Sequence, residues 1–267
     1  MECTLNPVKT LEHYKVHSLV FLIAFLAALT LAHPTFFFND EWITGNQLAQ
    51  LNEGHQALIN EGKYGVYKNG TPTEYFNFRH NYLGYPLLFP IISLPAERLV
   101  NFFGDHFIFF ITYLWTFLLI GIVLILNAFF PEYTYLKKWR WTTGLIVLVF
   151  AGLFLNLFFY APFHLTGKDA YPEITALVLT NVLLFALLSV TVFEILRVIL
   201  LDSRYAFFGT VVCISCSSYF FWTTVCKDHV LVAFIFSVIL LLIIKFLCTE
   251  NLLALAGGFF FVGLLVW

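Results

Sequence analysis

Acidic, basic and histidine side chains recur at three places along an otherwise apolar chain, each just outside a long hydrophobic stretch. The residues concerned are Asp40, Glu41, Lys168, Asp169, Glu173, Lys227, Asp228 and His229. Carboxylates can act as general bases or as oxygen ligands for a divalent cation, and lysine can stabilise a departing phosphate. If the fold brings the three places together, this combination suits group transfer from a phosphate-bearing lipid.

Each place also has an ordinary structural explanation. An Asp directly before a helix is a common N-cap, which would explain Asp169 and Asp228 without any chemistry. The lysine beside each of them would then form a surface ion pair of little energetic value. Asp40 and Glu41 would likewise be the solvated start of a loop with a helix-initiating Asp. The residue types alone leave both interpretations open.

The composition indicates that these residues are positioned by helices in a lipid bilayer. Of 267 residues, 60% are hydrophobic and 11% are charged, and the mean hydropathy is +0.85. Soluble domains usually carry about 25% charged residues. The net charge of -2 gives no electrostatic footprint for nucleic acid, so we expect membrane lipid and no nucleic acid among the partners.

Seven hydrophobic runs are long enough to cross a hydrocarbon core about 30 Å thick. They cover residues 17 to 33, 107 to 130, 142 to 163, 174 to 198, 206 to 225, 230 to 248 and 251 to 267. The predicted fold class is therefore all-α, a multi-pass transmembrane bundle of about seven spans in a single domain over residues 1–267. Because the last run reaches the final residue without a polar flank, we expect the chain to be C-terminally incomplete.

A further apolar segment, residues 85 to 103, is predicted not to be an eighth span. It contains Pro86, Pro90, Pro95 and the charged pair Glu97 and Arg98. Proline punctuation and paired charges suit an interfacial or re-entrant element better than a plain membrane crossing.

Lysine and arginine predict the orientation, because cytoplasmic loops are enriched in them. With a cytoplasmic N-terminus, eight of the fourteen basic residues fall inside: Lys9, Lys15, Lys137, Lys138, Arg140, Arg197, Arg204 and Lys245. This orientation puts the three charged segments described above on the external face, together with Arg79 and His80. We expect a cell-membrane protein whose active face is external.

Residues 34–106 would then form a large external first loop. Within it, Leu48, Leu51, His55, Leu58 and Ile59 recur at helical spacing. This pattern predicts an amphipathic helix over residues 46–61 that lies on the membrane surface.

The five cysteines give no framework for disulfides or metal. Cys213 and Cys216 have the spacing of a metal or redox pair, but they lie within a hydrophobic run and have no second ligand pair. We interpret them as small hydrophobic packing residues.

The layout of residues 17 to 175 resembles the GT-C superfamily of multi-pass glycosyltransferases, which use polyprenyl-phosphate-linked sugars. The likeness is to the branch of protein O-mannosyltransferases and lipid A aminoarabinose transferases. It rests on a first span that ends in Asp40-Glu41, a surface helix followed by Gly62, and the proline-containing stretch Gly84-Tyr85-Pro86-Leu87-Leu88. The chain departs from the family pattern where Gly-Tyr-Pro-Leu replaces Lys-Pro-Pro-Leu, and no C-terminal soluble domain is visible.

The resemblance implies a role for each candidate residue. Asp40 would be the general base or the carboxylate that organises the site, with Glu41 beside it, and Asp169 would be a second acid. The implied substrate-binding residues are Lys168, Lys227, Arg79, His80, Asp228, His229 and Glu173. A divalent cation, Mg or Mn, would bridge Asp40 and Asp169 if the reaction uses one.

The expected function is inverting transfer of a sugar from a polyprenyl-phosphate donor to a protein, lipid or glycan acceptor on the external face. A transporter or flippase is the competing hypothesis, although such proteins usually place ionisable groups near the midplane of their spans. A non-catalytic membrane scaffold is the third.

Overall fold

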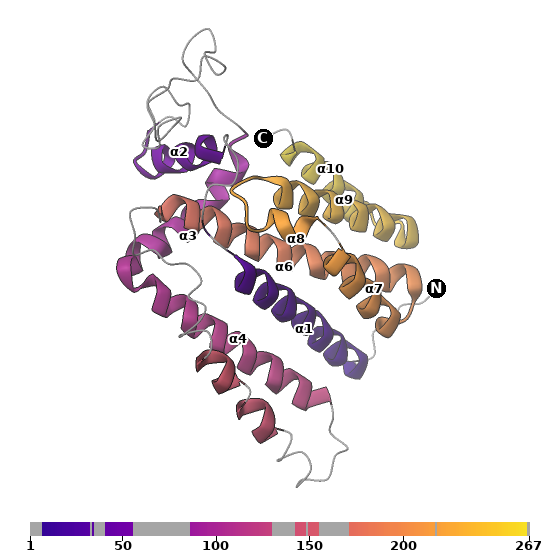
Figure 1. The fold of residues 1–267 in the computed structure, drawn as a ribbon. Coiled ribbons are helices and arrows are strands. Elements are labelled where there is room, and N and C mark those ends of the chain that lie inside the picture. The colour runs from indigo at the N-terminus through magenta and orange to yellow at the C-terminus, as the bar shows by residue number, and fades with distance from the viewer. Residues whose placement is uncertain are drawn as a thin grey trace.

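The computed structural model describes residues 7–32, 34, 41–55, 86–129, 142–147, 149–154, 171–216 and 218–265. Within these ranges the regular secondary structure is helical throughout. The labelled elements are α1 (Pro7–Leu31), α2 (Glu41–Asn52), α3 (Leu88–Phe103), η2 (Gly104–His106), α4 (Phe107–Phe129), α6 (Pro172–Leu200), α7 (Ser203–Cys216), α8 (Tyr219–Trp222), α9 (His229–Thr249) and α10 (Leu252–Leu264) (Figure 1). The all-α class expected from the sequence is therefore observed over the described ranges.

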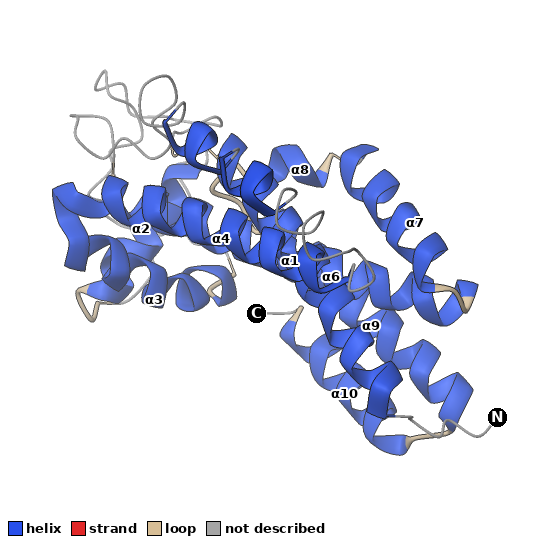
Figure 2. Ribbon diagram, turned by 90° about the horizontal axis from the view of Figure 1, so that it is seen from below, coloured by secondary structure: helices blue, strands red, loops and turns tan. Residues whose placement is uncertain are grey.

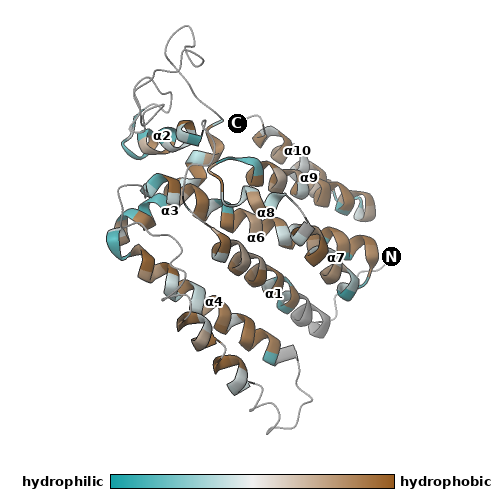
Figure 3. Ribbon diagram, viewed as in Figure 1, coloured by the Kyte–Doolittle hydropathy of each residue, from teal (hydrophilic) through white to brown (hydrophobic). Residues whose placement is uncertain are grey.

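Four stretches are long and apolar enough to cross a membrane: Tyr14–Leu31, Leu88–Asn127, Pro172–Leu200 and His229–Thr249. They overlap the expected crossings at 17 to 33, 107 to 130, 174 to 198 and 230 to 248. The second stretch also takes in residues 88–103, which the sequence analysis predicts not to be a separate span. In Figure 3 the long helices are mostly brown, whereas hydrophilic colour gathers at helix ends, on α2 and at the corner between α3 and α4. This distribution is that of a membrane protein.

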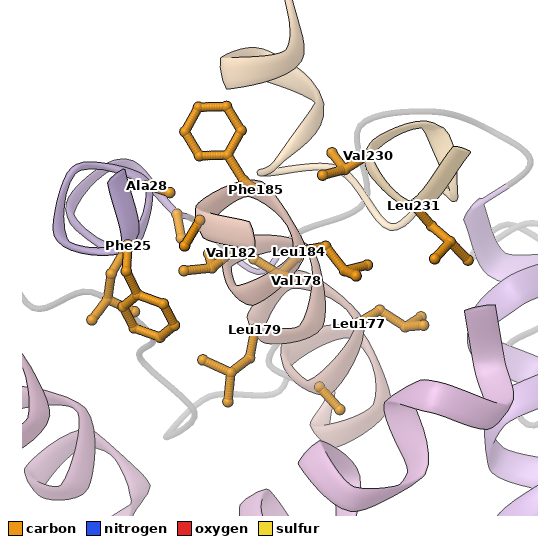
Figure 4. Packing of buried hydrophobic residues seen from close by; sticks show 14 of the residues in the cluster. Phe25, Ala28, Leu177, Val178, Leu179, Val182, Leu184, Phe185, Val230 and Leu231 are labelled. Atoms are coloured by element: carbon orange, nitrogen blue, oxygen red, sulfur yellow. The ribbon is translucent and has the colours of Figure 1, made fainter. Parts of the chain in front are cut away.

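Helix α6 is the central element of the bundle, and α1, α3, α7 and α9 pack against it. Figure 4 shows Phe25 and Ala28 of α1 and Val230 of α9 approaching α6 from different sides, with Val182 and Phe185 of α6 between them. Small residues recur every fourth position at Ala24 and Ala28 of α1 and at Ala32 just after its end, and all three are at most 3% exposed. Small residues at this spacing allow two helix backbones to approach closely.

A cluster of polar side chains, called the polar tie below, joins α1, α6 and α9 at one end of the bundle and consists of His17, Glu194, Arg197 and Lys245. Arg197 donates to both carboxylate oxygens of Glu194, from Nε at 2.9 Å and from Nη2 at 2.8 Å. His17 Nε2 on α1 lies 3.0 Å from Glu194 Oε2, and Lys245 Nζ on α9 lies 3.9 Å from Oε1. Because Glu194 is near the C-terminal end of α6 and His17 near the N-terminal end of α1, these two helices run antiparallel.

Helices α3 and α4 meet at a sharp corner instead of continuing as one span. Gly104, with φ of 49°, ends α3, and the short helix η2 then turns the chain into α4. A left-handed backbone angle of this kind is readily adopted by glycine. In Figure 1, α3 crosses the end of the bundle toward α2 and α6, while α4 runs away from the corner beside α1.

Three of the expected spans are not confirmed as membrane-crossing helices in the described ranges. The run at 206 to 225 is interrupted, because α7 ends at Cys216 and the one-turn helix α8 begins at Tyr219. The run at 251 to 267 contains the 13-residue helix α10, which packs beside α9 (Figures 1 and 2). The run at 142 to 163 is helical over residues 142–147 and 149–154, and its later part lies outside the described residues.

Helix α2 differs from the amphipathic surface helix expected at 46–61. It begins at Glu41, and its residues are buried from Glu41 to Ala49 against α3 and α6. It ends in a Schellman motif, in which His55 N donates to Gln50 O and Gly54 N, with φ of 76°, donates to Leu51 O. The remaining residues of the expected helix, 56–61, lie outside the described ranges.

Candidate functional site

Two of the candidate carboxylates lie buried where α2 and α6 begin. Glu41 is the first residue of α2 and is 0% exposed, and Glu173 lies in the first turn of α6 and is 3% exposed. Pro172 suits the first helical position of α6 because it has no N–H to satisfy there. The helix starts therefore bring acids from two distant parts of the sequence to the same end of the bundle.

Hydrogen bonds hold the segment between α8 and α9 against α6 at this end. Asn181 Nδ2 donates to the backbone oxygens of Val225 at 2.7 Å and of Lys227 at 2.9 Å. Cys226 lies between Val225 and Lys227 in the chain, and its thiol contacts Ile174 O at 3.8 Å. Since Asn181 and Cys226 are both 0% exposed, this segment is held from the protein interior.

The surroundings of the Cys226 thiol disfavour its ionisation. Burial raises the pKa of the Cys226 thiol well above its usual range, and the negative charge of Glu41 raises it further. Both effects disfavour the thiolate, the first by desolvation and the second by repulsion. Cys226 is therefore a packing residue here and is poorly suited to act as a nucleophile.

A small cavity opens between this segment, α2 and α3. Its volume is about 200 Å³, and it is lined by Thr44, Pro86, Phe89, Pro90, Lys227, Asp228 and His229. The His229 ring also packs edge-on against Trp222, with centroids 4.2 Å apart. Pockets for drug-sized ligands usually span about 300–1,000 Å³, so this volume suits one polar group of a ligand beside an apolar wall.

The structure thus brings five candidate residues to one end of the bundle: Glu41, Glu173, Lys227, Asp228 and His229. The other five, Asp40, Arg79, His80, Lys168 and Asp169, lie outside the described residues. Asp40 immediately precedes Glu41 in the chain, and Asp169 precedes Glu173 by four residues. Each of the three charged segments that the sequence analysis singled out therefore contributes at least one residue to this end of the bundle.

Two buried polar residues, one at this site and one further along α3, were not predicted from the sequence. Asn181 fastens the segment that carries Lys227, and Glu97, on α3, is 0% exposed and accepts a 3.4 Å hydrogen bond from Asn101. Polar side chains inside apolar helices are uncommon and usually have a defined partner. That rarity was the available signal for Asn181, which interrupts the long apolar run of α6.

No group of three His, Cys, Asp or Glu side chains that could hold a metal ion occurs among the described residues. The expected metal ligands Asp40 and Asp169 are not part of that set. Comparison of the chain with protein-family models, curated proteins and solved structures finds no match.

Proposed function

We propose that this protein is a membrane glycosyltransferase that moves a sugar from a polyprenyl-phosphate donor to an acceptor hydroxyl, with inversion at the anomeric carbon. One observation carries the proposal: Glu41, Glu173 and the Lys227–His229 segment meet at one end of an apolar helical bundle. Acids, a cation and a histidine in such a place provide both proton transfer and phosphate binding beside the lipid that would hold the donor.

The proposed reaction is a single displacement. The acceptor oxygen attacks the anomeric carbon, the bond from that carbon to the phosphate oxygen breaks, and the acceptor proton passes to Asp40 or Glu41. The departing polyprenyl phosphate keeps the bonding electron pair, and Lys227 stabilises its charge together with Lys168 or Arg79. Asp228 and His229 line the cavity from the same segment and would contact the sugar or the phosphate.

The buried position of Glu41 supports its assignment beside the general base. Interactions between charges are stronger where water is excluded, and a fixed carboxylate needs no reorganisation during the reaction. We further propose that Asp169 is a second acid and that Mg or Mn would be held by Asp40 and Asp169. The site is proposed to lie on the external face of a cell membrane.

The test is sugar transfer by the full chain reconstituted in liposomes, with polyprenyl-phosphate sugars as donors. Replacing a general base usually lowers the rate by about 10²–10⁴-fold, so Asp40→Asn is expected to fall in that range, with smaller losses for Glu41→Gln and Lys227→Gln. The matched control is Glu53→Gln, because Glu53 is largely exposed at the end of α2. Full activity of Asp40→Asn would remove Asp40 from the mechanism, and a wild-type chain that fails to bind polyprenyl phosphate would overturn the proposal.

A further inference from the structure

A second feature lies at the opposite end of the bundle, around the tie between Glu194, His17, Arg197 and Lys245. Among the side chains that the structure describes at this end, permanently cationic ones outnumber carboxylates by four to three. The cations are Lys15, Arg197, Arg204 and Lys245, and the carboxylates are Glu194, Asp202 and Glu250. Glu194 is already engaged by three partners, and Asp202 caps α7 by accepting from Arg204 N at 2.7 Å. The exposed Arg204 side chain thus adds positive charge that these carboxylates do not bind.

An apolar groove begins beside these cations and runs along α1. Its first part has a cavity volume of about 250 Å³ and is lined chiefly by Val20, Ile23 and Ala27 of α1 and by Phe207, Val211 and Ile214 of α7. A second cavity of about 360 Å³ shares Ile23 and Ala27 and continues to Leu31. From Val20 to Leu31 the helical rise is about 16 Å, close to the roughly 15 Å depth of one leaflet of the hydrocarbon core.

The helical spacing places basic residues at the start of this groove on both of its walls. On α7, Arg204 lies one turn before Phe207 on the face that also carries Val211 and Ile214. On α1, His17 lies one turn before Val20 on the face that leads to Ala27. Val20, Phe193 and Ala206 form a common buried cluster with Phe207 packed against it, and the Phe193 ring is 5.0 Å from that of His17. The cations and the groove are therefore parts of one continuous surface.

We propose that this surface binds an anionic phospholipid, with the phosphate at Arg204 and one acyl chain in the groove that runs along α1. Charge complementarity selects the head group, because positive charge here exceeds negative charge. The lining of the first cavity is apolar except for Thr210 and Ser215. This apolar lining and a length that matches one leaflet select a lipid tail. A soluble phosphate would use the cations but leave the groove unfilled. The site is separate from the proposed transferase site, which lies at the other end of α6.

The proposal is tested by native mass spectrometry of the full chain after exchange between nanodiscs of phosphatidylcholine and of phosphatidylcholine with phosphatidylglycerol. The expected result is one retained phosphatidylglycerol per chain in preference to phosphatidylcholine. A basic residue near a membrane surface contributes about 1 kcal/mol to binding an anionic lipid, so Arg204→Gln should weaken retention about fivefold. Ala27→Phe, which fills the groove from α1, should reduce it independently.

The control variants change the same residue types elsewhere. Arg98→Gln removes an exposed cation from α3, and Ala256→Phe adds a ring on the exposed surface of α10; both should retain phosphatidylglycerol like the wild type. Equal retention of the two lipids by the wild type would overturn the proposal. So would equal losses in the test and control variants, or unchanged retention in Arg204→Gln. Inorganic phosphate that competes fully with the lipid would reduce the site to a simple anion site.

Discussion

At the scale of single residues, the environment of Cys226 predicts low thiol reactivity. Alkylation requires the thiolate, and burial together with the charge of Glu41 raises the pKa of Cys226. A variant whose only cysteine is Cys226 is therefore expected to react with iodoacetamide much more slowly at pH 8 than one whose only cysteine is the exposed Cys248. Its rate should rise only at more alkaline pH. Equal rates at pH 8 would show that Cys226 is not buried beside Glu41.

Asn181 gives a second prediction at the residue scale. Asn181→Leu keeps the approximate size of the side chain but leaves the backbone oxygens of Val225 and Lys227 without their donor. Buried acceptors without partners cost about 1–3 kcal/mol each, so the variant should unfold at lower temperature in detergent. Hydrogen exchange of residues 223–229 should also accelerate. Asn101→Leu is the control, because Asn101 is exposed and makes a long 3.4 Å hydrogen bond; equal effects in both variants would contradict a specific fastening role.

The contrast between Glu41 and Asn181 explains how much of the site the sequence could predict. The sequence predicts Glu41, Lys227 and His229 as site residues because each is a polar residue directly beside an apolar run, and this pattern is visible without knowledge of the fold. Asn181 binds residues 44 and 46 positions further along the chain, and no local pattern specifies such a partner. The burial of Glu97 depends likewise on α3 packing against α6, which is a tertiary contact.

At the scale of elements, the C-terminal end of α6 predicts a stabilising substitution. Leu201 has φ of 57° and is 77% exposed, and a non-glycine residue in this left-handed region costs about 1–2 kcal/mol. Leu201→Gly is therefore expected to raise the unfolding free energy by about 1 kcal/mol in detergent. Ile199→Gly, two residues earlier within α6, should lower it by a similar amount because glycine destabilises helix interiors. A lower stability in Leu201→Gly would contradict the left-handed cap.

The positions of α1, α4, α6 and α9 could be predicted because each contains an apolar run of about the length that one crossing requires. The start of α1 could not, because the helix begins at Pro7, ten residues before the predicted run. The sequence predicts one continuous run over residues 206 to 225 and not the break between α7 and α8, although the run contains Ser215, Ser217 and Ser218. Serine side chains compete for backbone hydrogen bonds and weaken helices, but their effect was outweighed by the hydrophobicity of the whole run. The helical repeat of leucines predicts a start for α2 at Asn46 instead of Glu41, because Trp42 and Ile43, which are both buried, lie before that repeat.

At the scale of the whole molecule, α6 separates two polar regions with different character. One end carries the buried acids Glu41 and Glu173 and the segment fastened by Asn181, while the other carries the tie around Glu194. Glu173 and Glu194 lie 21 residues apart on α6, a rise of about 32 Å along its apolar body, and this sets the separation of the two regions. This arrangement allows the proposed transferase site and the proposed lipid site to be tested independently.

The central claim is that α2 meets the segment before α9 at a single site. Thr44→Cys and His229→Cys, introduced together into a chain without its native cysteines, measure this directly through cross-linking by a short bifunctional thiol reagent. Both positions line the same cavity, so we expect efficient cross-linking within the membrane-embedded chain. The control pair is Thr44→Cys with Lys245→Cys, sixteen residues further along α9 and about 24 Å away along its axis. Cross-linking of the control pair but not of the first pair would contradict the account.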